Sequence, residues 1–354
     1  MRNFPSVLEK IADLNINQIE GLLSLANKFK RRENYKYEPS LFLGRQPIVA
    51  NSFLENSTRT KNSFALAIQR LGCTYLDFNT ETSSLKKGES LDQTLLTLFA
   101  QGVDLCVIRS SVSKELETFK NNPPIRIING GDGIHEHPTQ ALLDLMTIRD
   151  HAMRKENLEL ADSDIEVDID SFKVLKGKKI SIIGDCKHSR VTHSLIALLP
   201  QFGMQVNLCG PEFFHMSQRD IEHYAQKNQK MITQTTSLDQ SLEDTDYIYL
   251  LRIQKERHLN KDISSPTVLK TMQDYHKLYG LSLEKFEKLG QKIPVLHPGP
   301  ANIGVELCQK LIDSNHYYGH EQVVNSVYMR MAIITAILKN GDKNVGCINN
   351  VPIR

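Results

Sequence analysis

Apolar and polar positions follow two repeating patterns along this chain. Short apolar runs that predict strands, such as CTYLDF, DLCVI and IRIIN, are separated by segments of helical period, such as LDQTLLTLFAQ and SKELETFK. Beyond residue 174 the alternation resumes, with KKISIIGD, MQVNLCG and DYIYLLR as strands and THSLIALLPQFG as a helix. Such alternation predicts parallel strands joined by crossover helices. We therefore expect an α/β fold of two similar lobes, each a parallel sheet with flanking helices, and an active-site cleft between them.

Three helices stand out by their apolar stripes. One follows the segment LENSTRT, and a second is predicted over PTQALLDLMTIRD. The third is predicted over EQVVNSVYMRMAIITAILKNG and stops at Asn340-Gly341, a usual C-terminal signal. The stripe of the first helix is formed by Phe64, Ala67, Ile68 and Leu71, and that of the third by Val324, Val327, Tyr328, Met331, Ile334 and Leu338.

The composition changes between residues 156 and 170, where acidic residues occur with no basic residue among them. Within this segment DIEVDID alternates apolar and acidic positions, which is typical of a short exposed strand. We interpret the segment as a solvated insertion, and a regulatory or partner-binding role stays open. The expected organisation is a first domain at 1–150, completed by a C-terminal helix at about 318–342, an insertion at 151–173 and a second domain at 174–317.

Composition and charge narrow the classes of function. The chain has 354 residues, with 40% hydrophobic and 24% charged residues, and a net charge of +2. That balance argues against a broad nucleic-acid surface, which needs a clustered basic face. The six cysteines show no C-x-x-C pair, and no apolar run reaches the roughly 18 residues of a membrane helix. We expect a cytoplasmic protein that binds neither nucleic acid nor membrane.

The segment STRT is the first candidate for chemistry. Ser57, Thr58, Arg59 and Thr60 place three hydroxyls and a guanidinium at the start of a helix. Backbone N–H groups and the positive end of the helix dipole bind anions there, and arginine adds forked donors suited to phosphate. A plain N-cap beside a solvent-facing arginine is the alternative reading.

A second candidate is NGGDGIHEHPTQALLDL, in which a glycine-rich loop leads into a helix. Pro138 suits the first turn of a helix and leaves His137 and Gln140 at the same end of it. A histidine at this place can polarise a carbonyl oxygen, although a capping or core histidine would look the same. The pair His135 and His137 hints at a metal, but no third ligand follows at a suitable spacing, so we expect no metal.

Further candidates follow predicted strands or lie on loops that contain glycine. Arg109 ends the strand CVIR, where open α/β sheets bind ligands. Hydroxyls and ammonium groups in TSSLKKGE form either a mobile phosphate clamp or a solvated turn. The full set comprises Ser83, Ser84, Lys86 and Lys87 of that loop, Arg190 in GDCKHSR, Arg252, Gln254 and Arg257 in LLRIQKER, and Pro298, Gly299 and Pro300 in HPGP.

Taken together and in this order, STRT, SSLKKGE, GDG..HPTQALLDL, SRVTHS, RIQKER and HPGP resemble the aspartate/ornithine carbamoyltransferase family, and specifically its aspartate branch. The resemblance runs from about Phe53 to Arg330. An ornithine enzyme would be expected to show HPCQ and HCLP where this chain has HPTQ and HPGP. Arginines at 190 and 252 suit the two carboxylates of aspartate.

The resemblance implies a role for each matching position. Residues 57–60 would hold the phosphate of carbamoyl phosphate. Thr60, Arg109 and His137 would bind its carbonyl oxygen, and Gln140 its amide nitrogen, with the carbonyls of Pro298 and Gly299. Ser83 and Lys87 would reach the active site of a neighbouring subunit, which implies a homotrimer. The residues implied for aspartate binding are Lys87, Arg190, Arg252, Gln254, Gly299 and Pro300, and those for catalysis are Arg59, Thr60, Lys87, Arg109 and His137.

The implied reaction is attack by the amine of L-aspartate on carbamoyl phosphate, an early step of pyrimidine synthesis that needs neither a metal nor an organic cofactor. Two alternatives stay open: a transcarbamoylase for another amino acid, such as ornithine, and a catalytically silent paralogue that scaffolds a pyrimidine enzyme. Association with regulatory or dihydroorotase chains is also open. The chain departs from the family at Ile303, where related bacterial chains usually carry an arginine.

Overall fold

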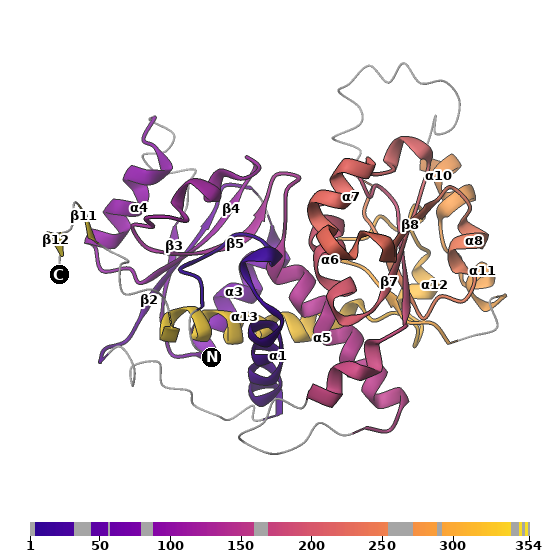
Figure 1. The fold of residues 1–354 in the computed structure, drawn as a ribbon, viewed down its shortest axis with the longest axis horizontal. Coiled ribbons are helices and arrows are strands. Elements are labelled where there is room, and N and C mark those ends of the chain that lie inside the picture. Colours follow the sequence, from indigo (N-terminus) through magenta and orange to yellow (C-terminus); the bar gives the residue numbers. More distant parts are fainter. Residues whose placement is uncertain are drawn as a thin grey trace. The chain divides into compact units, whose positions relative to one another are not determined.

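A computed structural model gives the fold of the chain (Figure 1). It describes residues 4–31, 44–55, 57–78, 88–158, 169–253, 272–288, 292–340, 347–348 and 351–352. These residues form two compact units. The first holds the described residues up to Met146, Ile169 and those from Val323 onward, and the second holds those within Thr147–Ala161 and Asp170–Gln322.

The first unit is built on a five-stranded sheet with the order β1-β5-β4-β2-β3, in which every pairing is parallel. The strands are β1 (Val7–Leu8), β2 (Ile48–Phe53), β3 (Thr74–Phe78), β4 (Leu105–Ser110) and β5 (Arg126–Asp132). The helices are α1 (Ile16–Arg31), α3 (Thr58–Arg70), α4 (Leu91–Ala100), the first part of α5 (Pro138–Lys155), most of α13 (Gly319–Asn340), and the 3-10 helices η1 (Ile11–Asp13) and η4 (Glu115–Phe119).

Helices cover both faces of this sheet. Cys106 and Ile108 of β4 belong to a buried apolar cluster with Leu95 and Leu98 of α4. Successive side chains of a strand point to opposite faces, so the other residues of β4 are buried against the opposite layer. Figure 1 shows α1, α3 and α13 on the side of the sheet away from α4. Burial on both faces explains why the strands read as continuous apolar runs.

The second unit repeats the plan with a parallel sheet of order β10-β9-β6-β7-β8. Its strands are β6 (Lys179–Ile183), β7 (Gln205–Cys209), β8 (Ile232–Thr235), β9 (Tyr247–Leu250) and β10 (Val295–Leu296). Its helices are α6 (Arg190–Leu198), α7 (Gln218–Ala225), α8 (Leu238–Leu242), α10 (Met272–Tyr279), α11 (Leu283–Glu287), α12 (Gln309–Ile312), and the 3-10 helices η5 (Ile169–Leu175), η6 (Leu199–Phe202), η7 (Glu212–Phe214) and η8 (Gln226–Met231). Near the C-terminus β11 (Cys347–Ile348) pairs antiparallel with β12 (Val351–Pro352).

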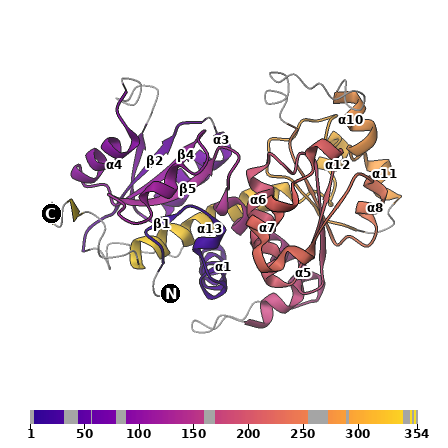
Figure 2. The ribbon, with the colours of Figure 1, turned by 45° about the horizontal axis from the view of Figure 1, so that its top comes forward.

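The core of the second unit lies between its sheet and the later helices. Ile248 and Leu250 of β9 join Leu238 of α8, Tyr275 of α10 and Phe286 of α11 in one buried cluster. Figures 1 and 2 show α6 and α7 on the other side of the sheet. The two-lobed α/β class predicted from the alternation of patterns is confirmed.

Most of the predicted elements are present, and three details differ. Residues 113–120 contain the 3-10 helix η4 rather than an α-helix. The helix predicted through Gly203 ends at Leu198, because Pro200 has no N–H to continue the α-helical bonding. Ile169 and Asp170 begin η5 instead of ending a strand, and the rest of the predicted acidic strand lies outside the described residues.

The apolar stripes predicted for α3 and α13 differ in how completely they are buried. Phe64, Ala67, Ile68 and Leu71 are all fully buried, as expected. In α13 the stripe is buried from Val327 to Leu338, but the side chain of Val324 is 50% exposed, so its assignment to the stripe was wrong. The apolar period of the sequence therefore extends one turn beyond the part of α13 that is buried.

The cysteine side chains follow the prediction made from the composition. The described cysteines at 73, 106, 186, 209 and 308 are reduced, and the first four are buried, as expected for scattered core thiols. Burial raises the pKa of the Cys106 thiol to about 12. Within the described ranges, no helix combines the length and the apolar character needed to cross a bilayer.

Candidate functional site

The start of α3 presents the STRT segment at the carboxyl end of β2. Ser57 is the N-cap residue with an extended backbone, but its side chain makes no capping hydrogen bond to the helix. Thr58 and Arg59 are exposed, whereas Thr60 is buried. The hydroxyl of Ser57 and the Arg59 guanidinium therefore lie beside a positive helix end without serving the fold as a cap. The missing capping bond agrees with an anion site, whereas the exposed Arg59 agrees with a solvent-facing arginine, so both interpretations of this helix start stay open.

Arg109 lies next to this helix start, because β4 pairs with β2 so that Arg109 is opposite Phe53. Its side chain is buried, and Nη1 donates a hydrogen bond to the carbonyl oxygen of Gly130 at 3.2 Å. Its Nε lies 3.3 Å from the Oε2 of Glu55. These two contacts hold a guanidinium at the carboxyl edge of the sheet, where ligands bind in open α/β folds.

The loop between β5 and α5 brings His137 to the same edge. The Nε2 of His137 lies 3.5 Å from the Oγ1 of Thr60, and both side chains are buried. One helical turn further, the Nε2 of Gln140 donates to the Oδ1 of Asp144 at 2.9 Å. The first unit thus brings a hydroxyl from α3, a guanidinium from β4 and an imidazole from the loop before α5 to one sheet edge, all three predicted from the sequence.

The charge of Asp144 also acts on Arg330 in the last long helix. Arg330 of α13 is fully buried with its guanidinium 4.9 Å from the centre of the Phe64 ring. Burial lowers the pKa of Arg330 to about 9, while the charge of Asp144 opposes that shift, so the guanidinium stays positive at neutral pH. Sequence reasoning missed both residues, because Asp144 and Arg330 lie on helix faces whose pattern predicts only core.

The acidic and histidine side chains near this loop include one group with metal-like spacing. Atoms of Glu9, Asp132 and His135 lie within 4.8 Å of one another, all buried. His135 is the one histidine of the HEH segment in this group, and Glu9 reaches it through the pairing of β1 with β5. However, the Lys120 ammonium already lies 2.7 Å from the Oε2 of Glu9 and 2.6 Å from the Oδ1 of Asp13. A positive charge is therefore built into this group.

The second unit places its predicted arginines at the carboxyl ends of β6 and β9. Arg190 is the first residue of α6 and is buried, and the Oγ of Ser189 caps that helix by accepting from the Thr192 N–H at 3.2 Å. Arg252 follows β9, and the neighbouring Leu251 N–H donates to the carbonyl of Ile183 at 2.9 Å. Both guanidinium groups thus belong to adjacent strand ends of one sheet.

The HPGP segment follows β10 at the same edge. The Nδ1 of His297 accepts a hydrogen bond from the Gly299 N–H at 2.8 Å, and the His297 N–H donates to the Oε1 of Gln322 at 2.9 Å. The peptide between Gly299 and Pro300 is cis. His297 was not singled out from the sequence, although the motif that contains it was. Its buried ring fixes the backbone whose carbonyl groups the sequence assigns to substrate binding.

Glu306 links this segment to the end of β9. Its Oε1 accepts from the Ile253 N–H at 2.7 Å and from the Nδ2 of Asn302 at 2.8 Å, and its Oε2 accepts from the Asn302 N–H at 2.8 Å. Burial raises the pKa of Glu306, and these donors partly offset the effect. Nothing in the local sequence pattern marks this residue, because its partners lie up to 53 positions away.

Three predicted site residues, Ser83, Lys87 and Gln254, lie outside the described residues, as do Ser84, Lys86 and Arg257. The departure at Ile303 falls on a side chain that is 57% exposed.

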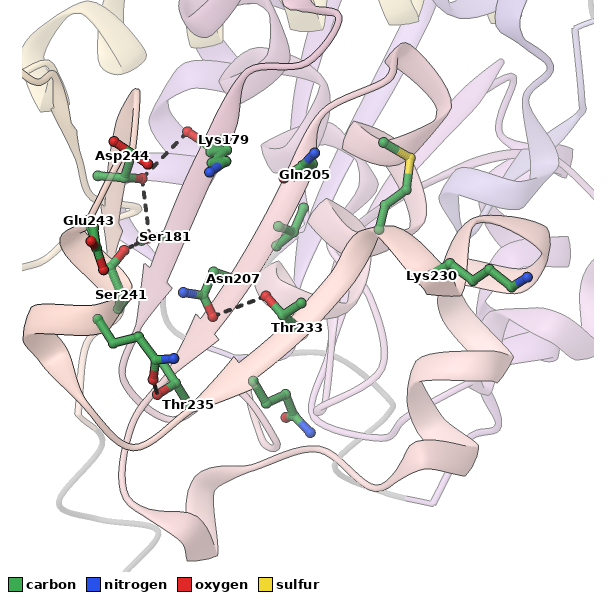
Figure 3. A pocket seen from close by; sticks show the side chains of 15 residues that line it. Lys179, Ser181, Gln205, Asn207, Lys230, Thr233, Thr235, Ser241, Glu243 and Asp244 are labelled. Carbon is green, nitrogen blue, oxygen red and sulfur yellow. Dashed lines mark hydrogen bonds between the residues drawn. The ribbon is translucent and has the colours of Figure 1, made fainter.

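A groove of about 510 Å³ on the second unit is separate from these strand ends (Figure 3). Lys179 and Gln205, the first residues of β6 and β7, line it together with Ser181, Asn207 and Thr233. Figure 3 shows polar side chains of the neighbouring strands side by side along it, with Thr233 donating to Asn207. It contains none of the predicted site residues, so we do not assign the reaction to it.

Comparison with known proteins identifies the family of the chain. Residues 7–150 match the family model for the carbamoyl-P binding domain of aspartate/ornithine carbamoyltransferases, and residues 176–337 match the model for the Asp/Orn binding domain. The chain belongs to the aspartate/ornithine carbamoyltransferase family. The two matched regions contain the helix starts and strand ends described above, and the family resemblance seen in the sequence is confirmed.

Individual carbamoyltransferases agree over nearly the whole chain. The aspartate carbamoyltransferase catalytic subunit of Ligilactobacillus salivarius is 38% identical over 348 residues, covering 96% of each chain. That of Lactococcus lactis subsp. cremoris is 36% identical over 334 residues, covering 94% of each. The aspartate transcarbamoylase of Trypanosoma cruzi in complex with carbamoyl phosphate has a TM-score of 0.77 at 26% identity, covering 96% of this chain and 97% of that one. The catalytic subunit from M. jannaschii has a TM-score of 0.73 at 28% identity, covering 94% and 98%.

Proposed function

We propose that this carbamoyltransferase is an aspartate carbamoyltransferase, which converts carbamoyl phosphate and L-aspartate to N-carbamoyl-L-aspartate and phosphate in pyrimidine synthesis. The observation that carries the proposal is the meeting of Thr60, Arg109 and His137 at one sheet edge beside the start of α3. Relatives named aspartate carbamoyltransferase support it, as do Trypanosoma cruzi structures with carbamoyl phosphate and aspartate.

In the first unit the start of α3 supplies the phosphate site. Ser57, Thr58, Arg59 and Thr60 donate to the phosphate oxygens, with Ser83 and Lys87 of a neighbouring subunit adding donors. Thr60, Arg109 and His137 donate to the carbonyl oxygen of the carbamoyl group. Gln140 is oriented by Asp144, and its amide oxygen accepts from the carbamoyl nitrogen together with the carbonyls of Pro298 and Gly299.

In the second unit the guanidinium groups of Arg190 and Arg252 bind the two carboxylates of aspartate, with Gln254 and the Lys87 of a neighbouring subunit as further donors. The backbone at Gly299 and Pro300 borders the amine. Two guanidinium groups suit a dicarboxylate, since each forms paired hydrogen bonds with a carboxylate. The reaction requires both sets of residues to act on one pair of substrates, and we propose that they face a common cleft.

The chemistry is an acyl transfer in which every atom is accounted for. The neutral amine of aspartate attacks the carbamoyl carbon, a C–N bond forms, and the carbonyl oxygen gains negative charge. Donors at Thr60, Arg109 and His137 stabilise that oxyanion, usually the largest contribution in such reactions. The C–O bond to phosphate then breaks, and the departing phosphate accepts the amine proton. We propose no metal or organic cofactor for these steps.

The first test removes the phosphate-binding guanidinium. For Arg59→Ala we expect turnover to fall about 10²- to 10⁴-fold, because two charged hydrogen bonds of roughly 1.5–3 kcal/mol each are lost. Arg70→Ala is the matched control: it removes the same residue type from the last turn of the same helix and should keep turnover. Normal turnover of Arg59→Ala in a steady-state assay would contradict the proposed site.

Substrate choice is tested separately. Turnover with L-aspartate, ornithine and N-acetylornithine should show activity with aspartate alone, and activity with ornithine would favour the ornithine-type alternative. Calorimetry with a phosphonate–dicarboxylate bisubstrate ligand, followed by an activity assay, tests the silent-paralogue alternative. Binding without turnover would support that alternative.

We also propose a homotrimer in which Ser83 and Lys87 complete the site of the neighbouring subunit. Dissociating Arg59→Ala and Lys87→Ala trimers and reassociating them together should restore about a quarter of the wild-type sites by random mixing around a closed ring. No gain on mixing two inactive variants would exclude shared sites. The native mass, with and without candidate regulatory or dihydroorotase chains, tests the higher assembly. A cytoplasmic location stays a prediction from the sequence.

A further inference from the structure

The turn between β5 and α5 sets the position of His137. Gly131 and Gly133 both have positive φ, at 108° and 42°, so the backbone reverses sharply between the strand and the helix. The Gly133 N–H donates to the Ser110 carbonyl at 2.9 Å, and the His135 N–H donates to the Asp132 carbonyl at 2.9 Å. A short, tightly turned loop of this kind transmits a shift at its start directly to the residue that follows it.

Asp132 stands at the end of β5 and binds this turn with both carboxylate oxygens. Oδ1 accepts from the Nδ2 of Asn129 at 2.8 Å and from the Glu136 N–H at 3.2 Å. Oδ2 accepts from the Lys114 N–H at 2.7 Å, and the Nδ1 of His135 lies 3.0 Å from it. The Asp132 N–H also donates to the Glu136 carbonyl at 3.2 Å. One buried side chain thus connects the strand, the loop before η4 and the residue next to His137.

A second set of contacts ties the same turn to the N-terminal segment. The Oε2 of Glu136 accepts from the Ile11 N–H at 3.0 Å, and the Nδ2 of Asn129 donates to the Glu9 carbonyl at 2.7 Å. Lys120 fixes that segment in turn through its ion pairs with Glu9 and Asp13. The N-terminal segment therefore fixes the turn at Glu136, and the Asp132 carboxylate fixes it at the end of β5.

We propose that Asp132 is a positioning residue for catalysis, because its carboxylate fixes the turn that aims the His137 imidazole beside Thr60. This inference rests on the proposed role of His137 at the carbamoyl oxygen. The distance of 3.5 Å between His137 Nε2 and Thr60 Oγ1 is at the limit of a hydrogen bond. A small tilt of the helix start therefore separates the two donors. Oxyanion donors must be aimed within fractions of an ångström to be effective.

The ionisation of Asp132 agrees with this role. Burial alone would raise the pKa of this carboxyl, but the hydrogen bond and charge of His135, with donors from Asn129 and Lys114, hold the pKa below its usual value. The group is therefore a carboxylate at neutral pH. A neutral amide in its place offers one acceptor oxygen where the turn requires two.

A double-mutant cycle tests the proposal. In the wild-type background Asp132→Asn should lower kcat about 10- to 100-fold and leave the KM for aspartate within about twofold, since only a donor to the transition state is displaced. In a His137→Ala background the same substitution should change kcat by less than about twofold, because the side chain that it positions is absent. Equal effects in both backgrounds, or no effect in the wild type, would overturn the inference.

Two further variants keep the outcomes distinct. Asp104→Asn is the matched control, since Asp104 is another buried carboxylate of the first unit that accepts from a backbone N–H, that of Ile48 at 2.9 Å. It should lower the urea midpoint while keeping kcat; a fall in kcat equal to that of Asp132→Asn would show a general stability effect and refute positioning. If Asp132→Asn does not fold, His135→Gln weakens the same carboxylate contact and is put through the same cycle. Normal kcat in His137→Ala alone would instead defeat the proposed function.

Discussion

Replacing Glu306 by glutamine tests how the second unit holds its aspartate-binding arginine. The carboxylate is 1% exposed and accepts three hydrogen bonds of 2.7–2.8 Å, one from the Ile253 N–H beside Arg252 and two from Asn302 in the segment after Pro300. It therefore fixes the ends of two loops that the proposed mechanism assigns to aspartate. Glutamine has the same shape but only one acceptor oxygen.

The magnitude follows from that count. If the remaining oxygen keeps the Oε1 contacts, the amide NH₂ faces the Asn302 N–H and leaves it buried without an acceptor, which costs about 1–3 kcal/mol. The other two bonds weaken from charge-assisted to neutral, which costs about 1 kcal/mol each. Removing a buried charge offsets part of this loss of free energy, since burial disfavours the ionised form of Glu306 and raises its pKa. We expect a net loss of roughly 2 kcal/mol in unfolding free energy.

The assay is aspartate saturation at saturating carbamoyl phosphate, combined with urea unfolding. Glu306→Gln should raise the KM for aspartate about tenfold, the equivalent of roughly 1.4 kcal/mol, with a smaller change in the KM for carbamoyl phosphate. Because the pKa of Glu306 is raised, the wild-type KM for aspartate should also rise on mild acidification, and the variant should lose that pH dependence.

Asp246→Asn is the control for these measurements. Asp246 accepts from the Lys179 N–H at 2.9 Å at the opposite, amino end of the same sheet. It should lower stability without changing the KM for aspartate. An unchanged KM in Glu306→Gln, alongside the expected loss of stability, would refute the positioning of Arg252 by this carboxylate.

Three further outcomes are expected. Burial and the nearby Arg154, Lys155 and Lys178 lower the pKa of His151 to about 4 from 6.5. Between these pH values the unfolded chain binds more protons than the folded chain, so the free energy of unfolding should fall as the pH drops from 6.5 to 4. Thermal unfolding of His151→Gln should therefore show a flatter pH profile. Gly133→Ala should cost more than about 1 kcal/mol in urea unfolding, because φ is positive and the new Cβ would lie 2.3 Å from the Oγ of Ser113; wild-type stability would contradict this. Arg252→Lys should raise the KM for aspartate with little change in that for carbamoyl phosphate, since lysine cannot form the paired bond to a carboxylate; equal changes in both KM values would argue against the assignment.

The sequence predicts what depends on local pattern. The helix after STRT could be placed because Phe64 and Leu71 face the core within one element. Arg109 could be placed because a strand ends there, and strand ends in parallel sheets mark ligand sites. Each of these inferences uses only a few neighbouring residues.

Contacts between distant segments could not be predicted in the same way. Glu9 reaches His135 only through the pairing of β1 with β5, and Glu306 reaches Ile253 across a long connection. The exposure of Val324 shows the converse, because a correct helical period does not reveal where the opposing surface ends. The local pattern indicates which face of an element is buried, whereas the partner across that face depends on topology.

In both units a buried carboxylate accepts hydrogen bonds from the backbone of the proposed binding loops. Substrates and products of the proposed reaction are anions that leave after every turnover, so they cannot serve as permanent acceptors for the loops that bind them. In each unit a buried carboxylate takes that part: Asp132 accepts the N–H groups of Lys114 and Glu136, and Glu306 accepts those of Ile253 and Asn302. Backbone donors of the loops are thereby satisfied within the protein. The cationic side chains next to them can then exchange one anion for another while the loops keep their shape, which is the preorganisation that an oxyanion site needs.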